Sequence, residues 1–130
     1  MIAENKKING GIITSKLRET KKFYTEVLGF KIKYDTDWYC LMHCPDNPGS
    51  EIAFLTPNHP SQAPIFQAEY QGGGIWFTYE VDDVEAEYNR ILKRGVPIEV
   101  DLRDEEWGDK HFAVKDPNGV GIDIVTYIHR

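Results

Sequence analysis

The chain has 130 residues, of which 41% are apolar and 28% are charged, and its formal net charge at pH 7 is −6. This is the composition of a folded globular protein rather than of a disordered chain. The acidic balance, without a long basic run, excludes the usual electrostatic signature of a nucleic-acid binder, and no apolar stretch reaches the roughly 20 residues that span a bilayer.

The first half of the chain is predicted to form a strand, a helix and three further strands. Residues 8–15 are apolar and are predicted to form the first strand. Apolar side chains then recur at helical spacing over residues 17–28, and Gly29 stands where a helix commonly ends with a glycine. Three short strands follow, at 30–34, 39–43 and 51–55. The last two of these are separated by a turn-rich stretch at 44–49.

The second half repeats this order of elements. Residues 75–81 form a β-prone run rich in aromatic side chains. A helical face begins at Val84, and the helix is predicted to close at Gly95. Strands are predicted at 97–102, 111–115 and 120–127, and the last two are joined by the Asp-Pro-Asn-Gly turn at 116–119. The order strand, helix, strand, strand, strand therefore occurs twice.

This repeat predicts an α+β fold made of two tandem βαβββ modules within a single domain of residues 1–130. Module one is expected at about 7–56, the linker at about 57–73 and module two at about 74–128. Each module exposes one face of its sheet, so two can pair into a curved mixed sheet or open barrel around a cleft, with the helices outside. The linker is long for a loop, which predicts a short helix or a functional role there.

Three stretches resemble the vicinal oxygen chelate superfamily, which includes glyoxalases, bleomycin-resistance proteins and extradiol dioxygenases. Residues 22–30 resemble the helix-to-strand corner of its first module, and residues 79–84 resemble the strand-to-helix corner of its second. Residues 107–119, with Trp-Gly before a strand and an Asp-Pro-x-Gly turn after it, resemble the final hairpin of bleomycin-resistance-like members. The resemblance covers nearly the whole chain and implies the fold, but it leaves the function open.

The resemblance also implies four positions at which metal-dependent members bind a divalent ion through His, Gln or Glu. This sequence has Asn9, Phe54, Trp76 and Asp123 at those positions. Phe and Trp cannot coordinate an ion, and Trp76 would fill the space. Alternation places Glu51 on the opposite strand face from Phe54, so only a slip or a bulge would bring it inward. We therefore predict no bound metal and no cofactor.

Strand alternation predicts which side chains line the cleft. Thr78 and Glu80 share a face with Trp76, and Trp38 and Trp107 lie at loop ends where a rim is expected. Such a lining suits a planar or cationic organic ligand, since stacking and cation–π contacts contribute about 0.5–2 kcal/mol each. The acidic run 101–106 is predicted to be a solvated loop, from which Arg103 could reach an anionic ligand. The predicted ligand-binding residues are Asn9, Trp38, Phe54, Trp76, Glu80, Trp107, His111 and Asp123.

Three functions remain open. The first is a metal-independent small-molecule binding protein similar to drug-sequestering resistance proteins. The second is a lyase, isomerase or dioxygenase relative that uses an unexpected metal site, or acid–base catalysis by Asp123, Glu80 or His111. The third is a structural or regulatory domain in which Trp76 and Phe54 fill the cleft as core. Stoichiometric binding without turnover distinguishes the first from the other two.

Partners and location follow from the same features. A small-molecule ligand is expected, with neither nucleic acid nor membrane, and the family resemblance implies a homodimer. Residues 1–7 lack the apolar segment of a secretory signal. The two cysteines, Cys40 and Cys44, are too few for a disulfide framework. A cytoplasmic location is therefore predicted.

Overall fold

The computed structural model describes residues 6–127 and divides into two compact units, Met1–Tyr70 and Gln71–Arg130. We call these units module one and module two and describe each by itself. Module one takes in most of the predicted linker at 57–73. This stretch contains a short 3-10 helix, η2 (Pro64–Phe66), as its length predicted. The backbone N–H of Tyr70 donates to the carbonyl of Ile13 at 2.9 Å, so the end of the stretch is tied to the first strand.

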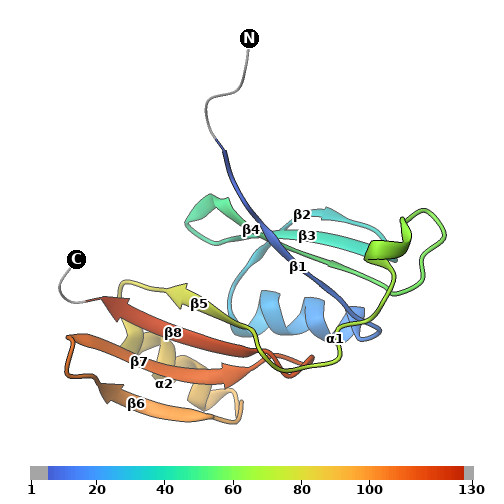
Figure 1. Ribbon diagram of the computed structural model, residues 1–130. Coiled ribbons are helices and arrows are strands. Elements are labelled where there is room, and N and C mark those ends of the chain that lie inside the picture. The colour runs from blue at the N-terminus through green and yellow to red at the C-terminus, as the bar shows by residue number, and fades with distance from the viewer. Residues whose placement is uncertain (1–5, 128–130) are drawn as a thin grey trace. The chain divides into compact units, whose positions relative to one another are not determined.

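Within the described residues, module one is an open four-stranded mixed sheet in the order β1-β4-β3-β2 (Figure 1). β1 runs parallel to β4, and the other pairs are antiparallel. The last strand begins earlier than predicted because Cys44 pairs with Asn47, which reduces the turn to two residues. The strands are β1 (Gly10–Ile13), β2 (Lys31–Asp35), β3 (Tyr39–Cys44) and β4 (Asn47–Leu55).

The helix of module one has two parts. α1 (Leu17–Lys22) is α-helical and continues as a wider π-helical turn, η1 (Phe23–Val27). Tyr24 in this turn is buried, and its ring lies 4.8 Å from that of Phe54 on β4. This contact packs the helix on the sheet. Gly29 ends the helix with a φ of +79°, a left-handed conformation that glycine adopts without strain.

Module two has the same architecture in the part that the structure describes: an open four-stranded sheet in the order β5-β8-β7-β6. β5 runs parallel to β8, and the remaining pairs are antiparallel. The second predicted strand of this module starts late, at Val100 rather than at residue 97. The elements are β5 (Trp76–Glu80), α2 (Val84–Lys93), β6 (Val100–Asp104), β7 (Asp109–Lys115) and β8 (Gly121–Tyr127).

α2 is defined at both ends by its sequence. The side chain of Asp83 caps its first turn by accepting a hydrogen bond from the backbone N–H of Ala86 at 3.1 Å. Gly95, with a φ of +77°, follows its last turn. The ring of Tyr88 meets that of Phe112 on β7 edge-on, with centroids 5.1 Å apart, so this helix packs on one face of its sheet.

The predicted repeat of two βαβββ modules with mixed sheets is confirmed. In each module one sheet face is buried under the helix, and we call the opposite face the open face. No helix within residues 6–127 is long and apolar enough to cross a membrane. The buried side chains on the helix-covered faces are Ile12, Cys40, Met42, Ile52 and Phe54 in module one, and Phe112, Val114, Ile122 and Ile124 in module two.

Candidate ligand-binding site

The open face of module two brings several predicted site residues together. Asp123 on β8 pairs with Thr78 on β5 and with Ala113 on β7. Directly paired residues point to the same side of a sheet, so these side chains form one row. His111 pairs with Val125 in the next row, which makes it a diagonal neighbour of Asp123. The alternation predicted from the sequence therefore holds on this face.

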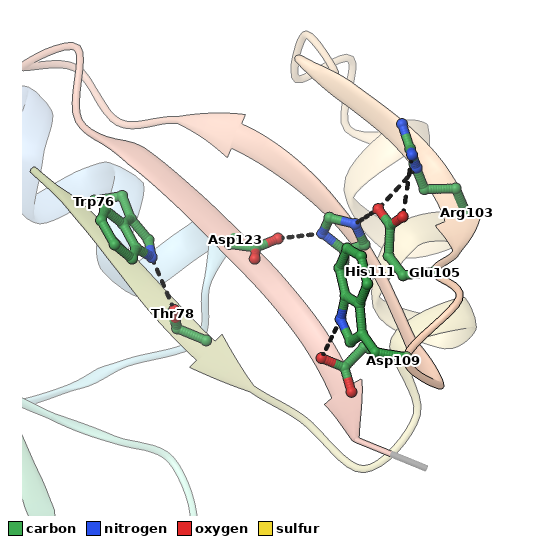
Figure 2. Close-up of polar contacts among 8 residues, drawn as sticks. Trp76, Thr78, Arg103, Glu105, Asp109, His111 and Asp123 are labelled. Carbon is green, nitrogen blue, oxygen red and sulfur yellow. Dashed lines mark hydrogen bonds and ion pairs between the residues drawn. The ribbon is translucent and has the colours of Figure 1, made fainter. Parts of the chain in front are cut away.

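Trp76 and Glu80 flank Thr78 on the same face. The indole of Trp76 is 67% exposed, and its Nε1 donates to the hydroxyl of Thr78 at 3.1 Å (Figure 2). This ring is therefore not part of the core of module two. Glu80 is exposed and forms no ion pair with any residue in 6–127. Together they place a flat aromatic surface and an uncompensated carboxylate on one strand.

His111 lies at the centre of a chain of polar contacts (Figure 2). Its Nδ1 lies 2.6 Å from Oδ1 of Asp123, and its Nε2 lies 2.6 Å from Oε2 of Glu105. Neutral imidazole has a single N–H, whereas imidazolium donates from both nitrogens. Two carboxylates at hydrogen-bond distance from the two nitrogens therefore favour the charged ring.

Arg103 extends this chain. Its Nε lies 2.9 Å from Oε2 of Glu105, and its Nη2 donates to Oε1 at 3.1 Å. A guanidinium that engages both carboxylate oxygens fixes the orientation of the carboxylate. Arg103 also pairs with His111 across β6 and β7, so the strand register places both groups beside Glu105. We call Arg103, Glu105, His111 and Asp123 the relay.

The pKa values in the relay follow from these contacts. Partial burial of the His111 ring opposes its protonation, but the hydrogen bonds to Asp123 and Glu105 outweigh it and raise the pKa of His111. The hydrogen bond from His111, assisted by Arg103, lowers the pKa of Glu105 against a smaller effect of desolvation. The side chains of His111 and Glu105 are only 18% and 11% exposed. The contacts of the relay therefore favour the protonated form of His111 and the ionised form of Glu105.

Asp123 differs from Glu105 in that one of its oxygens is available. Oδ1 is bonded to His111, whereas Oδ2 accepts no hydrogen bond from the residues that the structure describes. The carboxylate is therefore held in place from one side. Its second oxygen can accept a hydrogen bond from a ligand beside the hydroxyl of Thr78 and the indole of Trp76.

The prediction of a solvated loop at 101–106 is wrong for residues 101–104, which belong to β6. The loop that remains, 105–108, contains Glu105, which lies beside His111 and is not among the predicted site residues. The loop is tied back by the backbone: the N–H of Glu105 donates to the carbonyl of Asp109 at 2.8 Å. The sequence feature that indicates the position of Glu105 is the hairpin, because a turn just before residue 109 places Arg103 opposite His111. Trp107, in that turn, is exposed and donates from Nε1 to Asp109 at 2.9 Å.

Two of the predicted site residues in module one lie on different faces of its sheet. Phe54 is fully buried against Tyr24, so its ring faces the helix and we leave it out of the site proposed below. Ala53, one residue earlier, points to the open face, where it pairs with Gly11. Asn9 lies on the open-face side, and its Nδ2 donates to Oε1 of Glu51 at 3.1 Å. The prediction that Phe54 lines the cleft is therefore wrong, and Glu51, which was expected on the other face, lies on the open face instead.

Trp38 precedes β3 in module one, as expected for a residue at a strand end. One face of its indole is covered by the ring of His59, with centroids 3.8 Å apart and planes within 12°. The ring of Tyr39 lies 5.9 Å from its centroid. The indole is therefore engaged within its own module.

The donor set of the described residues does not fit the metal centre found in part of the family. Within residues 6–127, no group of three or more His, Cys, Asp or Glu side chains is arranged to hold a metal ion. Both nitrogens of His111 are occupied by carboxylates, and both oxygens of Glu51 are occupied by lysines. Trp76 has no coordinating atom suited to a divalent ion. We therefore derive no chemistry through a metal.

The pocket found near α2 is a separate feature. It has a volume of about 280 Å³ and is lined mainly by acidic side chains at the start of α2. Lys110 lies in it and forms an ion pair with Glu85 at 2.6 Å. Because Lys110 and Thr126 alternate with His111 and Val125 along their strands, this pocket lies on the helix side of the sheet, away from the relay.

The model of the Glyoxalase/Bleomycin resistance protein/Dioxygenase superfamily matches residues 8–124. The chain therefore belongs to this superfamily, as its sequence motifs predicted. The uncharacterized protein YurT of Bacillus subtilis (strain 168) is 36% identical over 81 residues, a match that spans 58% of this chain and 63% of YurT.

Solved structures of two relatives share the fold. Lactoylglutathione lyase from Agrobacterium tumefaciens has a TM-score of 0.75 and 19% identity, with 95% of this chain and 96% of that chain covered. TnmS3, an antibiotic binding protein from Streptomyces sp. CB03234, has a TM-score of 0.71 and 19% identity, with 98% of each chain covered. One is named as an enzyme and the other as a binding protein, so the fold alone does not decide between these functions.

Proposed function

We propose that the protein is a metal-independent small-molecule binding protein that holds a planar, cationic organic ligand on the open face of module two. The observation that carries the proposal is the exposed indole of Trp76 beside Asp123, whose carboxylate is fixed by His111 and keeps one oxygen available. Stacking on the indole and an ion pair with the carboxylate are complementary contacts for such a ligand.

The charges on this face favour a cation over an anion. Within the relay Arg103, together with His111 in its protonated form, offsets the negative charges of Glu105 and Asp123. Glu80 adds a further negative charge, and it has no basic partner among the described residues. The face is therefore net negative next to an aromatic ring. Trp107, exposed in the turn before β7, provides a second indole at the edge of the same module.

The likeness to TnmS3 supports this proposal because an antibiotic binding protein shares the fold over almost its entire length. The enzyme alternative, a lyase or isomerase that uses acid–base catalysis, is less well supported. His111 would have to break one of two short hydrogen bonds before it could accept or deliver a proton to a substrate. Asp123, through its second oxygen, and the exposed Glu80 on the same face are the carboxylates that could take a proton from a bound molecule.

A homodimer and a cytoplasmic location complete the proposal. The family resemblance supports the first. For the second, Cys40 is buried and Cys44 half-buried, and both are free thiols, which suits a reducing compartment. Light scattering coupled to size-exclusion chromatography would measure the mass in solution, and a monomer at all concentrations would exclude the dimer.

The test is a calorimetric titration with proflavine, a planar cation, and with fluorene as a neutral planar compound of similar size. Proflavine is expected to bind with one-to-one stoichiometry and to be recovered unchanged, whereas fluorene binds at least about tenfold more weakly. Trp76→Ala and Asp123→Asn are each expected to weaken proflavine binding by about tenfold, which corresponds to about 1.4 kcal/mol.

Two substitutions are matched controls. Trp38→Phe changes an indole already stacked on His59, and Asp101→Asn changes a carboxylate that accepts a hydrogen bond from the hydroxyl of Tyr88 on α2. Both are expected to leave the affinity unchanged. Equal affinity for proflavine and fluorene, or unchanged binding in Trp76→Ala, would contradict the proposal. Chemical conversion of a bound compound that stops in Asp123→Asn would establish the enzyme alternative.

A further inference from the structure

Module one contains a second charged cluster, independent of the relay. The carboxylate of Glu51 on β4 is only 6% exposed, and both of its oxygens are occupied. Lys7 lies 2.7 Å from Oε1, and Lys33 lies 2.8 Å from Oε2. Asn9 donates to Oε1 at 3.1 Å. Two ammonium groups from distant parts of the chain thus converge on one nearly buried carboxylate.

The backbone of β2 is built to bring Lys33 to this cluster. The register between β2 and β3 shifts between Ile32, which pairs with Met42, and Tyr34, which pairs with Leu41. Lys33 is therefore the extra residue of a β-bulge. A bulge re-aims side chains that a regular strand would place elsewhere, and bulges are common beside binding sites. The irregularity has the effect of placing an ammonium group on Glu51.

The cluster carries an excess positive charge. Hydrogen bonds from Lys33 and Lys7 lower the pKa of Glu51 to about 2, so this carboxylate is ionised at any working pH. One negative charge faces two positive charges. Each ammonium has three N–H donors and forms one contact with Glu51, its sole partner among residues 6–127. The lysine side chains are 48% and 53% exposed, so the remaining donors face outward.

An aromatic surface adjoins the cluster. Tyr34 follows Lys33 in the bulge and is 58% exposed. Its ring lies 6.0 Å from that of Tyr39 on the neighbouring strand, with the planes tilted at 58°. A molecule that binds both features needs an oxyanion at one end and an apolar, preferably aromatic, body at the other. This is the reverse of the charge preference on the open face of module two.

We infer that Lys7 and Lys33, held apart by Glu51, form an oxyanion-binding site for an aromatic carboxylate on module one. Glu51 acts as a spacer in this site. It stops the two ammonium groups from repelling one another while it leaves their outward donors unused. The inference does not depend on the function proposed for module two.

The test follows the backbone amide signals of the full-length protein by NMR during titration with sodium benzoate, sodium acetate and inorganic phosphate at constant ionic strength. Benzoate is expected to give saturable shifts in residues 31–35 and at Glu51, with a Kd on the order of millimolar. Acetate is expected to bind about tenfold more weakly, because it lacks the ring that contacts Tyr34. Phosphate that bound more tightly than benzoate would overturn the aromatic part of the inference.

The variants separate a binding site from a structural ion-pair cluster. Lys33→Met and Lys7→Met are each expected to raise the Kd for benzoate about tenfold, whereas Lys93→Met, at an exposed position on α2, leaves it unchanged. Glu51→Gln removes the charge that holds the two ammonium groups beside one another and is expected to raise the Kd. If Glu51→Gln does not fold, the Lys33→Met and Lys7→Met variants still distinguish a binding site from a structural ion-pair cluster. Absence of saturable shifts, or the same Kd in Lys33→Met and wild type, would overturn the inference.

Discussion

Nδ1 of His111 lies 2.6 Å from Oδ1 of Asp123, and this hydrogen bond joins the last two strands of module two on their open face. The opposite ring nitrogen is held at the same distance by Glu105. Because both contacts are donated only by imidazolium, the folded chain binds the proton of His111 more tightly than the unfolded chain does. The relay therefore couples protonation to the conformation of the carboxylate that we assign to ligand binding.

This coupling predicts a pH-dependent stability. The pKa of His111 is raised above its usual value of 6.5, so its protonation stabilises the folded state fully below the unfolded-state pKa. That contribution is lost as the pH rises through the folded-state pKa. The difference in free energy of unfolding between wild type and His111→Gln should therefore be largest below about pH 6.5 and shrink as the pH rises above that value through the folded-state pKa of His111. Urea denaturation at several pH values measures it, and a constant difference would contradict the prediction.

A second prediction concerns Glu105, which had no assigned role at the level of sequence. Glu105→Gln removes the carboxylate at Nε2 and should lower the pKa of His111, as followed by NMR of the ring protons. Asp109→Asn, which changes a carboxylate bonded to Trp107, should leave that pKa in place. An unchanged His111 pKa in Glu105→Gln would show that the contact at Nε2 is not maintained in solution.

Glu105, the carboxylate partner in the same contact, makes stability depend on pH in the opposite direction to His111. The pKa of Glu105 is lowered from its usual value of 4.5, so the ionised carboxylate stabilises the folded state above that value. The contribution is lost as the pH falls through the folded-state pKa. Wild type should therefore lose its stability advantage over Glu105→Gln below about pH 4.5, in the same denaturation series.

The fold could be predicted from the sequence because the residues that end the helices and orient the strands act locally. Gly29 and Gly95 end the two helices with φ values of +79° and +77°, and the alternation along β5, β7 and β8 placed Trp76, His111 and Asp123 on one face. These features depend on the backbone of a few neighbouring residues. They could therefore be predicted without knowledge of tertiary contacts.

The predictions failed where the pairing register between strands decides which face a side chain occupies. Phe54 was aligned with a ligand position, but pairing with β1 and β3 turns it toward Tyr24 and leaves Ala53 on the open face. A displacement of one residue along a strand exchanges its two faces. Glu105 was missed because only the pairing of β6 with β7 brings it to His111. Neither relationship can be worked out from spacing alone.

Gly95 provides a direct test of the helix end. A Cβ at this position would meet nothing within 4 Å, so Gly95→Ala carries a conformational cost without a steric clash. The left-handed conformation costs alanine about 1–2 kcal/mol, which should appear as a lower free energy of unfolding in urea. Gly95→Asn should lose less, because asparagine tolerates this conformation. Equal losses in the two variants would show that the positive φ is not the cause.

Substitution by alanine is expected to have opposite consequences at Phe54 and at Trp76. The comparison distinguishes an aromatic residue of the core from one that faces a ligand. Phe54 is fully buried, so Phe54→Ala should lower the free energy of unfolding by about 3–5 kcal/mol. Trp76 is 67% exposed, so Trp76→Ala should change it by only about 0.5 kcal/mol, while proflavine affinity falls. Urea denaturation of both variants measures this. A large loss of stability in Trp76→Ala would instead show that the indole is packed as core, as in the structural or regulatory alternative, and would leave module two without its stacking surface.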